Sequence, residues 1–356
     1  MSNFLSKKCV PFKTFGGNGG DSFSHYKDDG SMISRVEAYF DDFYMKGIKV
    51  YYSNSKYGYS KNDMGYLYGK EEGQKFEYTF APGETFMDFS IYSVEYKGKY
   101  YVGGFKFSTS KGNTFYPKSA VAFYRESKMD VGFGAAVGFG GHYDSDAVYN
   151  FGFYFIRQAK KIRLYDVAYD KVKFSKPVKN SIVSVPYMNK TDEEEMHEYQ
   201  YSYNSFVESL WKPNSYFDYS YSLTVSADVP YLTAYNDKES PYASWTYHRE
   251  TSNSSAYSSS HKISDKYSFV VPPYTKMNFE MIYFSGHFEV PFYGRVSLTL
   301  DNNEMFDYFV SGNYVGGNTT HALVAMTSTP IDSNGTPIGD SEVVYDFVNM
   351  YERMAA

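Results

Sequence analysis

Two neighbouring stretches of this chain alternate strictly between apolar and polar residues. The apolar positions are Tyr199, Tyr201 and Tyr203, and then Phe217, Tyr219, Tyr221, Leu223 and Val225. The intervening polar positions are Gln200, Ser202 and Asn204, and then Asp218, Ser220, Ser222, Thr224 and Ser226. Successive side chains of a β-strand point to opposite faces, so a period of two gives each stretch one apolar and one polar face. Both stretches are therefore predicted to be strands, and together they favour a hairpin.

The rest of the chain also favours β-structure. No long segment places apolar residues at i, i+3, i+4 and i+7, the pattern that a core-facing helix requires. The 41 tyrosines and 30 phenylalanines belong to the residue types that suit the pleated surface of a sheet. We therefore expect an all-β protein. At 356 residues, the chain exceeds what one hydrophobic core usually organises, which predicts two domains.

Charge and cysteine content exclude several function classes. The formal net charge is −6 and the lysines are scattered, so nucleic acid is not an expected partner. Cys9 is the only cysteine, which excludes an intrachain disulfide and argues against a cysteine-based metal site. We expect neither a cofactor nor a bound metal.

The N-terminal sequence lacks the apolar core of a secretory signal peptide, and no apolar run is long enough for a membrane helix. The expectation is a soluble protein that is cytoplasmic or leaves the cell by an unconventional route.

The first 160 residues alternate between short apolar runs and turn-forming clusters. The predicted strands are Ile33–Tyr39, Lys46–Tyr52, Lys75–Phe80, Phe86–Tyr96, Tyr101–Ser108 and Val148–Arg157. A glycine-rich loop, Phe15–Phe23, precedes them and provides for tight turns and close backbone approach. Short strands at this spacing predict a barrel, a sandwich or a prism.

An ordered set of motifs makes this region resemble the jacalin-related lectins. The motifs are Gly17-Asn18-Gly19-Gly20 with Phe23, Ile33–Glu37, Ile48–Tyr52, Gly83–Phe86, Phe105–Gly112, Gly138–Gly141 and Asp146–Val148. The resemblance implies a β-prism domain over residues 10–158, with a metal-free sugar site between the glycine loop and a later Gly-x-x-x-Asp loop. Another kind of all-β domain is the alternative.

The resemblance also implies which residues contact a mannose-type or galactose-type sugar. They are Gly19, Gly20, Gly141, His142, Tyr143, Asp144 and Asp146. Backbone N–H groups near glycine donate to sugar hydroxyls, and a carboxylate accepts from two hydroxyls through charge-assisted hydrogen bonds. The chain departs from the family pattern because His142, not glycine, stands four residues before Asp146. The alternative for Asp146 is a loop carboxylate that caps neighbouring amides.

The second module is expected to span residues 159–356, because from about Arg163 glycine nearly disappears until Gly286, and Ser, Thr, Asn and Tyr increase. The predicted hairpin runs from Glu198 to Ser226, and its turn at Lys212-Pro213-Asn214 is crowded by Phe206, Val207, Leu210 and Trp211. A hairpin with one polar face, one apolar face and an apolar tip suits a β-barrel pore, and about ten residues per strand cross a bilayer.

In a pore, the predicted hairpin would divide into lipid-facing and lumen-facing residues. The membrane-inserting set is Tyr199, Tyr201, Tyr203, Phe206, Val207, Leu210, Trp211, Phe217, Tyr219, Tyr221, Leu223 and Val225. The lumen set is Gln200, Ser202, Asn204, Asp218, Ser220, Ser222 and Thr224. Against this assignment, tyrosine belongs to the membrane interface more than to the hydrocarbon centre. The alternative is an ordinary sandwich hairpin with one solvated face.

The order of segments in this module resembles the aerolysin-like pore-forming proteins. The segments are Leu223–Pro230, Thr251–Ser260, Phe269–Thr275, Met277–Phe284 and Phe288–Phe292. The resemblance implies an elongated, twisted β-sheet, and the pairing with a lectin prism is similar to natterin-like proteins. It implies a toxin or defence protein that binds glycans on a target-cell membrane, assembles into a homo-oligomer and inserts the hairpin.

Other function classes remain as alternatives. The first is a lectin that binds or agglutinates glycans without forming pores, its second module serving as an oligomerisation scaffold. The second is a glycosidase with paired carboxylates, whose separation a sequence does not reveal. The sequence has no nucleophile elbow, phosphate loop or metal-ligand cluster, so we expect a protein that is not an enzyme.

Overall fold

The computed structural model describes residues 3–53, 65–81, 83–170, 178–213, 223–237, 240–252, 256–319 and 322–347. Within these ranges the chain forms one short helix, α1 (Asn3–Lys8), and 22 strands. The predicted all-β fold class is confirmed. The one described helix is too short and too polar to cross a bilayer.

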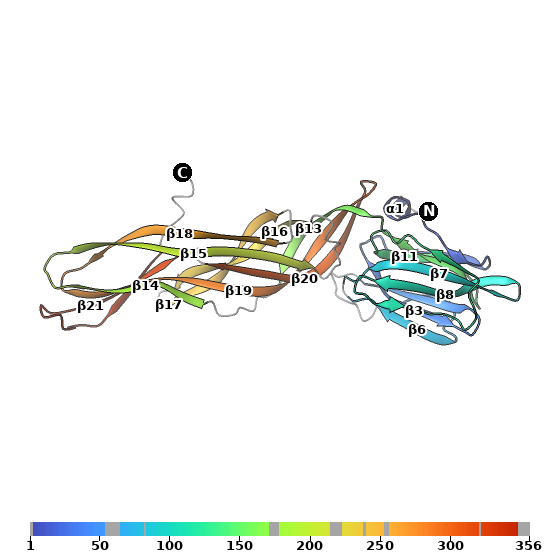
Figure 1. Ribbon diagram of the computed structural model, residues 1–356, viewed down its shortest axis with the longest axis horizontal. Helices are drawn as coiled ribbons and strands as arrows, with labels where there is room; N and C mark the ends of the chain where they lie inside the picture. The colour runs from blue at the N-terminus through green and yellow to red at the C-terminus, as the bar shows by residue number, and fades with distance from the viewer. Residues whose placement is uncertain are drawn as a thin grey trace. The chain divides into compact units, whose positions relative to one another are not determined.

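The first part of the chain folds into three four-stranded sheets (Figure 1). The first sheet has the order β1 (Phe15–Gly16), β12 (Val148–Phe155), β11 (Ala136–Tyr143) and β2 (Asp21–Tyr26). The second has the order β10 (Arg125–Lys128), β7 (Phe86–Tyr96), β8 (Lys99–Thr109) and β9 (Thr114–Phe115). The third has the order β5 (Tyr66–Gly69), β4 (Met45–Ser53), β3 (Met32–Phe40) and β6 (Gln74–Thr79).

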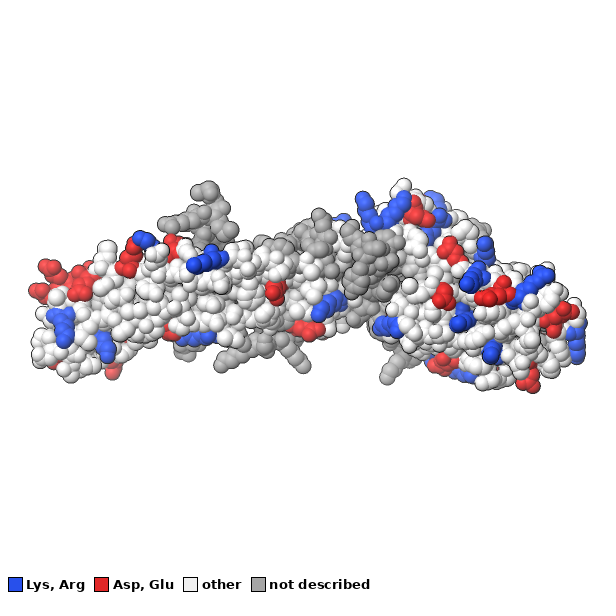
Figure 2. All heavy atoms as spheres, viewed as in Figure 1, with Lys and Arg blue, Asp and Glu red and all other residues white. Residues whose placement is uncertain are grey.

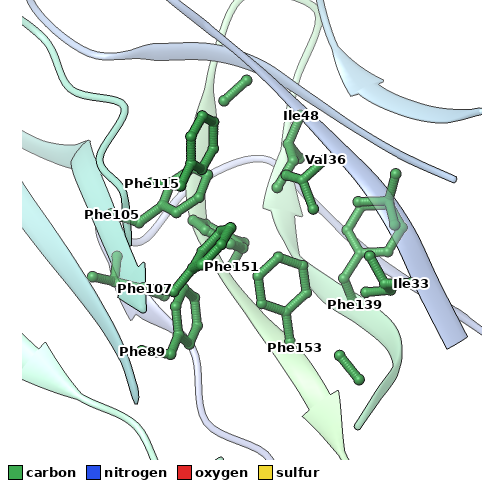
Figure 3. Packing of buried hydrophobic residues seen from close by; sticks show 14 of the residues in the cluster. Ile33, Val36, Ile48, Phe89, Phe105, Phe107, Phe115, Phe139, Phe151 and Phe153 are labelled. Carbon is green, nitrogen blue, oxygen red and sulfur yellow. The ribbon is translucent and has the colours of Figure 1, made fainter. Parts of the chain in front are cut away.

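One aromatic core joins these three sheets, as the predicted β-prism requires. Rings from β7, β8 and β12 meet aliphatic side chains from β3 and β4 (Figure 3). The ring centroids of Phe105 and Phe151 lie 5.2 Å apart in an edge-on arrangement, and those of Phe89 and Phe153 lie 5.0 Å apart. Edge-on and tilted pairs of this kind add favourable quadrupole interactions to the burial of apolar area. The prism is thus closed by phenylalanines contributed by separate sheets.

The six strands predicted in this region are all present. Six further strands, β1, β2, β5, β9, β10 and β11, were not predicted. β11 carries Gly138, Gly140 and Gly141, and glycine weakens the strand signal of a sequence. Added Cβ atoms at Gly138 and Gly140 would lie 2.5 Å from the carbonyl oxygen of His25 and 2.9 Å from that of Phe23, so β2 packs directly on these glycines.

The rest of the chain builds a ten-stranded sheet. Its main path has the order β17 (Ser240–Ser252), β16 (Leu223–Asp237), β13 (Ala159–Tyr169), β19 (Thr275–Leu300), β20 (Met305–Thr319), β15 (Glu195–Pro213) and β18 (Ala256–Val271). Three further strands attach beside it, namely β14 (Val178–Asn189), β21 (Leu323–Pro330) and β22 (Glu342–Phe347). β14 and β21 both pair with β19, and β22 pairs with β21.

The chain divides into two compact units. Unit 1 comprises Met1–Ala168, Pro213–Ser226 and Phe292–Gly312, and unit 2 comprises Tyr169–Lys212, Ala227–Pro291 and Asn313–Ala356. Charged side chains of both signs are interspersed on the face shown in Figure 2. The division of the sequence into domains at residues 158 and 159 stays a prediction.

In the described part of the second stretch, residues 223–226, the predicted pairing with the first stretch is wrong for this fold. β15, which contains the first stretch, pairs antiparallel with β18, from Glu195 opposite Val271 to Leu210 opposite Ala256. The second stretch enters β16 at Leu223, which lies opposite Ile162 of β13 in a parallel pair. Alternation specifies which face a strand buries, but it does not specify the partner strand.

The alternation itself is confirmed along β15. Tyr201 and Tyr203 are buried in a cluster with Phe269 and Phe279, whereas the intervening polar side chains are exposed. Leu223 and Val225 are likewise buried and Thr224 is half-buried. The hairpin residues Phe217, Asp218, Tyr219, Ser220, Tyr221 and Ser222 lie outside the described residues.

Trp211, near the C-terminal end of β15, packs against other residues of the same protein. Trp211 is only 2% exposed, and its indole nitrogen donates to the hydroxyl of Tyr169 at 3.0 Å. Its ring centroid lies 5.2 Å from that of Tyr314. Phe206, Val207 and Leu210 are half-buried on the same strand. In this conformation the sheet therefore has one solvated face, as the sandwich alternative expects.

Candidate carbohydrate-binding site

Asp146 lies in the loop between β11 and β12 and accepts hydrogen bonds from Lys46 of β4 and from Tyr44, which directly precedes β4. Its Oδ1 accepts from the Lys46 ammonium at 2.8 Å, and its Oδ2 accepts from the Tyr44 hydroxyl at 3.1 Å. The ammonium of Lys70 is 3.6 Å from Oδ1. The Asp146 side chain nevertheless remains 55% exposed. The hydrogen bond from Lys46, supported by Tyr44 and by the charge of Lys70, holds the pKa of Asp146 below its ordinary value.

Lys46 is the buried half of this ion pair. Its side chain is only 5% exposed, and its ammonium lies 4.9 Å from the ring centroid of Tyr44. Burial by itself lowers the pKa of Lys46, but the hydrogen bond to Asp146 and the charges of Asp146 and Asp41 outweigh it, so the pKa is raised. The base of the site is therefore a fixed cation with a carboxylate aimed away from the core.

Asp144 holds the shape of the same loop. Its Oδ1 accepts from the backbone N–H groups of Asp146 at 2.7 Å and Ala147 at 2.9 Å, and its Oδ2 accepts from the Tyr149 hydroxyl at 2.9 Å. Partial burial opposes ionisation, but these hydrogen bonds prevail and the pKa of Asp144 is lowered. The capping role considered for Asp146 is therefore performed by Asp144, which leaves the Asp146 side chain outside the turn.

The glycine loop lies directly against the Asp146 loop. Gly20 has a φ of 69°, and a Cβ added there would lie 2.2 Å from the carbonyl oxygen of Tyr143. At Gly19, an added Cβ would lie 2.6 Å from the ring of Tyr149. Both positions therefore exclude any side chain. The two loops that the resemblance assigned to one site are neighbours in space.

The other predicted site residues belong to β11 and support the loops. His142 Nδ1 donates to Asn150 Oδ1 at 3.1 Å, because the Asn150 amide nitrogen is itself donating to the carbonyl of Gly17 at 2.7 Å. The Tyr143 ring packs edge-on against Phe23 at 5.6 Å. An added Cβ at Gly141 would lie 2.1 Å from the Asn150 carbonyl oxygen. None of these arrangements tests whether the residues contact a sugar, which stays a prediction.

Tyr44, Lys46 and Lys70 were not predicted to belong to the site. Lys46 and Asp146 are separated by 100 positions in the sequence, and the contact depends on β4 beginning beside the β11–β12 loop. No spacing rule relates the two segments, so a single sequence gives no signal for this pair. Within the described ranges, no group of three His, Cys, Asp or Glu side chains is placed to hold a metal ion.

Parts of this chain are similar to known proteins. A family model described as "Jacalin-like lectin domain" matches residues 12–154. The crystal structure of lamprey immune protein is 19% identical, with a TM-score of 0.56, over 95% of this chain and 100% of that chain. Malaysian banana lectin is 23% identical over 42% of this chain and 99% of its own, with a TM-score of 0.35. A mannose-specific jacalin-related lectin from Morus nigra is 20% identical over 42% of this chain and 96% of its own, with a TM-score of 0.34. No curated protein sequence matches the chain.

Proposed function

We propose that this chain, whose residues 12–154 are a jacalin-like lectin domain, binds glycans at the Gly20 and Asp146 loops and carries a pore-forming part to glycan-bearing membranes. One observation carries the lectin half of this proposal. The Asp146 carboxylate is ionised, held from beneath by Lys46, and more than half exposed beside a loop that excludes side chains.

The carboxylate has capacity for a sugar while keeping its protein partners. An ionised carboxylate offers about four acceptor positions, and Lys46 and Tyr44 occupy one on each oxygen. Two vicinal sugar hydroxyls can donate to the positions that remain. Lys70, which is 46% exposed, supplies a donor for a sugar oxygen at the same edge. Such charge-assisted hydrogen bonds are short and about twice as strong as neutral ones.

The membrane half of the proposal rests on β15 and on the resemblance of the second module to aerolysin-like proteins. β15 separates a polar from an apolar face between Glu198 and Asn204, and the whole strand of 19 residues is longer than a membrane strand needs. In a pore its apolar face would meet lipid, its polar face would line the lumen, and several copies would close the barrel. Both edges of β15 are paired in this fold, with β20 and with β18, so a barrel that pairs β15 with other strands would require it to leave a present neighbour such as β18. The fold shared with lamprey immune protein supports the architecture alone.

Titration calorimetry with methyl α-mannoside and methyl α-galactoside tests the lectin claim. We expect one of the two sugars to bind the parent chain, and Asp146→Asn to reduce its affinity at least tenfold. Asn keeps the side-chain shape but loses the charge that strengthens hydroxyl hydrogen bonds. Asp332→Asn, a charge-matched change in a turn of unit 2, is the control and should bind like the parent. Equal binding by parent and Asp146→Asn would refute the assignment.

A second function, a lectin that does not form pores, has its own supporting observation. Tyr201, Tyr203 and Trp211 of β15 are already buried within unit 2, and the two tyrosines belong to the cluster around Phe279. A strand that satisfies its apolar face within the fold has no need of lipid. Glycan binding without membrane permeabilisation is the outcome that would establish this function.

A further inference from the structure

The outer face of the β10–β7–β8–β9 sheet carries a set of aromatic rings that the site described above does not use. These rings are Tyr92, Tyr100, Tyr116, Phe123 and Tyr124, which together we call the tyrosine platform. Tyr92 stacks on Phe123 at 4.6 Å and lies 5.6 Å from Tyr116, and Tyr100 lies 5.1 Å from Tyr124. Tyr100, Tyr116 and Tyr124 are 39%, 37% and 49% exposed.

The strand register makes room for this platform. Tyr92 of β7 lies opposite Gly104 of β8, a position without a side chain. A Cβ added at Gly104 would lie 2.9 Å from Cβ of Lys118 and 3.1 Å from the ring of Phe123. The glycine therefore lets the segment that carries Lys118 and Phe123 lie over β8. The backbone geometry holds the rings in place. Ligand binding therefore costs less side-chain conformational entropy than it would with mobile rings.

Three cations border the platform. The ammonium groups of Lys106 and Lys118 lie 5.9 and 5.1 Å from the ring centroid of Tyr116, and the Arg125 guanidinium lies 4.9 Å from that of Tyr124. Among the described residues, no carboxylate oxygen lies within 4.0 Å of any of these cations. In a chain of net charge −6, this aromatic surface is thus edged by three cations that lack a carboxylate counter-ion in the described structure.

Two carboxylates also lie at the platform. Glu95 lies opposite Tyr100 in the β7–β8 pair and interacts electrostatically with Tyr100 and Tyr124. Glu126 Oε1 accepts from the Tyr92 hydroxyl at 3.3 Å. Glu126 thus orients Tyr92 and does not neutralise Lys106, Lys118 or Arg125. The balance of charge at the platform remains positive.

The platform is continuous with the proposed sugar loops. A Cβ added at Gly17 would lie 1.6 Å from the carbonyl oxygen of Tyr100, so the glycine loop rests directly on this end of the platform. Phe123 packs against the buried cluster that contains Tyr44 and Tyr149. Tyr44 donates to Asp146 and Tyr149 donates to Asp144, so one set of side chains borders both surfaces.

From these observations we propose that the tyrosine platform is an extended subsite for carboxylate-bearing saccharide units, an inference that rests on the proposed glycan-binding function. The apolar C–H face of a pyranose ring packs on an aromatic ring, whose face carries partial negative charge. Arg125 and Lys118 at the ring edges pair with the sugar carboxylate, Arg125 through a two-point hydrogen bond. A glycan with a neutral unit at Asp146 continues across Gly17 onto this surface.

The charge and position of the platform select this occupant. An acidic saccharide packs on the rings and supplies a carboxylate to cations that have none within 4.0 Å among the described residues, and it reaches the platform without leaving the sugar loops. An anionic lipid surface would satisfy the cations alone and is distinguished by the experiment below. If the occupant were a second copy of this chain, which carries a net negative charge, sedimentation would detect a dimer.

Isothermal titration with a hyaluronan hexasaccharide, compared with an uncharged chitin hexasaccharide of equal length, tests the proposal. We expect the parent chain to bind hyaluronan at least tenfold more tightly at low salt, with the preference shrinking as salt screens the charges. Lys118→Glu/Arg125→Glu should abolish the preference. Lys13→Glu, an exposed charge reversal beside a different sheet, should retain it. Far-ultraviolet circular dichroism and the melting temperature verify that each variant folds.

The outcomes separate this proposal from the proposed function. Loss of hyaluronan preference in Lys118→Glu/Arg125→Glu with unchanged binding of the simple methyl glycoside supports the platform. A parent chain that binds both hexasaccharides equally overturns it, as does a double variant that keeps the preference. Equal binding of the parent to phosphatidylserine vesicles lacking sugar, or platform-dependent dimerisation, also overturns it. Failure of Asp146→Asn to weaken methyl glycoside binding would instead contradict the proposed lectin site.

Discussion

Lys46 donates to Asp146 across 2.8 Å and fixes the carboxylate of the β11–β12 loop to the start of β4. Lys46→Met removes this donor while keeping a similar side-chain volume. We expect the pKa of Asp146 to rise toward its ordinary value of about 3.9, because the largest stabilising interaction of the anion is lost. Glycoside affinity should fall several-fold, since the carboxylate is no longer held in one orientation.

Carboxyl carbon NMR across a pH titration measures this shift directly. Lys70→Met is the matched control, because Lys70 is more exposed and lies 3.6 Å from the same oxygen. Its effect on the Asp146 pKa should be smaller. A larger effect from Lys70→Met than from Lys46→Met would show that the two lysines have been ranked wrongly.

Gly20 and Gly98 allow backbone strain to be separated from steric clash. Both have positive φ values, 69° and 73°, but nothing lies within 4 Å of a Cβ added at Gly98. Gly98→Ala should cost about 1 kcal/mol of unfolding free energy, which is the penalty for the left-handed conformation alone. Gly20→Ala should cost more and should weaken glycoside binding, because the added methyl group pushes against Tyr143. Denaturant titration of the two variants, together with calorimetry, compares them; equal losses would argue against close packing of the two loops.

Glu84 predicts how the stability of the prism depends on pH. Its carboxylate is buried and accepts from Tyr78 at 2.5 Å, from Thr109, from Asn113 at 3.0 Å and from the backbone of Ala81 at 2.8 Å. Burial opposes its ionisation, but these donors prevail and lower the pKa of Glu84. The stabilisation is therefore complete above the unfolded pKa of about 4.3 and is lost as pH falls through the lower folded value.

Glu84→Gln should lower the unfolding free energy by about 2 kcal/mol at pH 7, because its amide places a donor among donors. The difference from the parent should shrink as pH falls below about 4, where the parent carboxylate also becomes neutral. Exposed Glu126→Gln should remain within about 0.5 kcal/mol of the parent throughout. Urea unfolding at several pH values measures both variants. A decrease in unfolding free energy by Glu84→Gln that became larger toward low pH would contradict this prediction.

Release of β15 from β18 is tested by a reversible cross-link. Ser202 and Ser264 lie directly opposite each other on these strands and are both exposed, so cysteines there can form a disulfide. The native Cys9 should not interfere, because burial raises the pKa of its thiol to about 12. We expect Ser202→Cys/Ser264→Cys to permeabilise glycan-bearing vesicles only after reduction. Full leakage by the oxidised form would show that β15 and β18 stay paired on the membrane.

Some strands of the structure are predictable from the sequence, and others are not. Strands such as Phe86–Tyr96 were predictable because their side chains alternate or form bounded apolar runs. β11 was not predicted because glycine weakens the strand signal of a sequence. In this strand the glycines allow close packing of neighbouring backbones. The partner of β15 was missed because alternation defines a buried face and leaves the choice among partner strands to long-range packing.

The candidate site likewise contains residues that sequence motifs identify and residues that only the fold brings together. Gly20 and Asp146 were identified through the order of motifs that resemble a family, and the structure places their loops side by side. Lys46 and Tyr44 were not, because only the folded prism brings the start of β4 to Asp146. The cations of the tyrosine platform lie on three separate segments, and their shared surface appears only in the folded sheet.

We propose that sugar binding at Asp146 directs the protein to permeabilise a membrane. Dye release from vesicles that display the glycoside found to bind, with and without an excess of the free glycoside, measures it most directly. We expect rapid release by the parent chain, inhibition by the free glycoside, and at least tenfold slower release by Asp146→Asn. Glycoside-dependent binding to the vesicles without any release would contradict it and would leave a lectin that does not form pores.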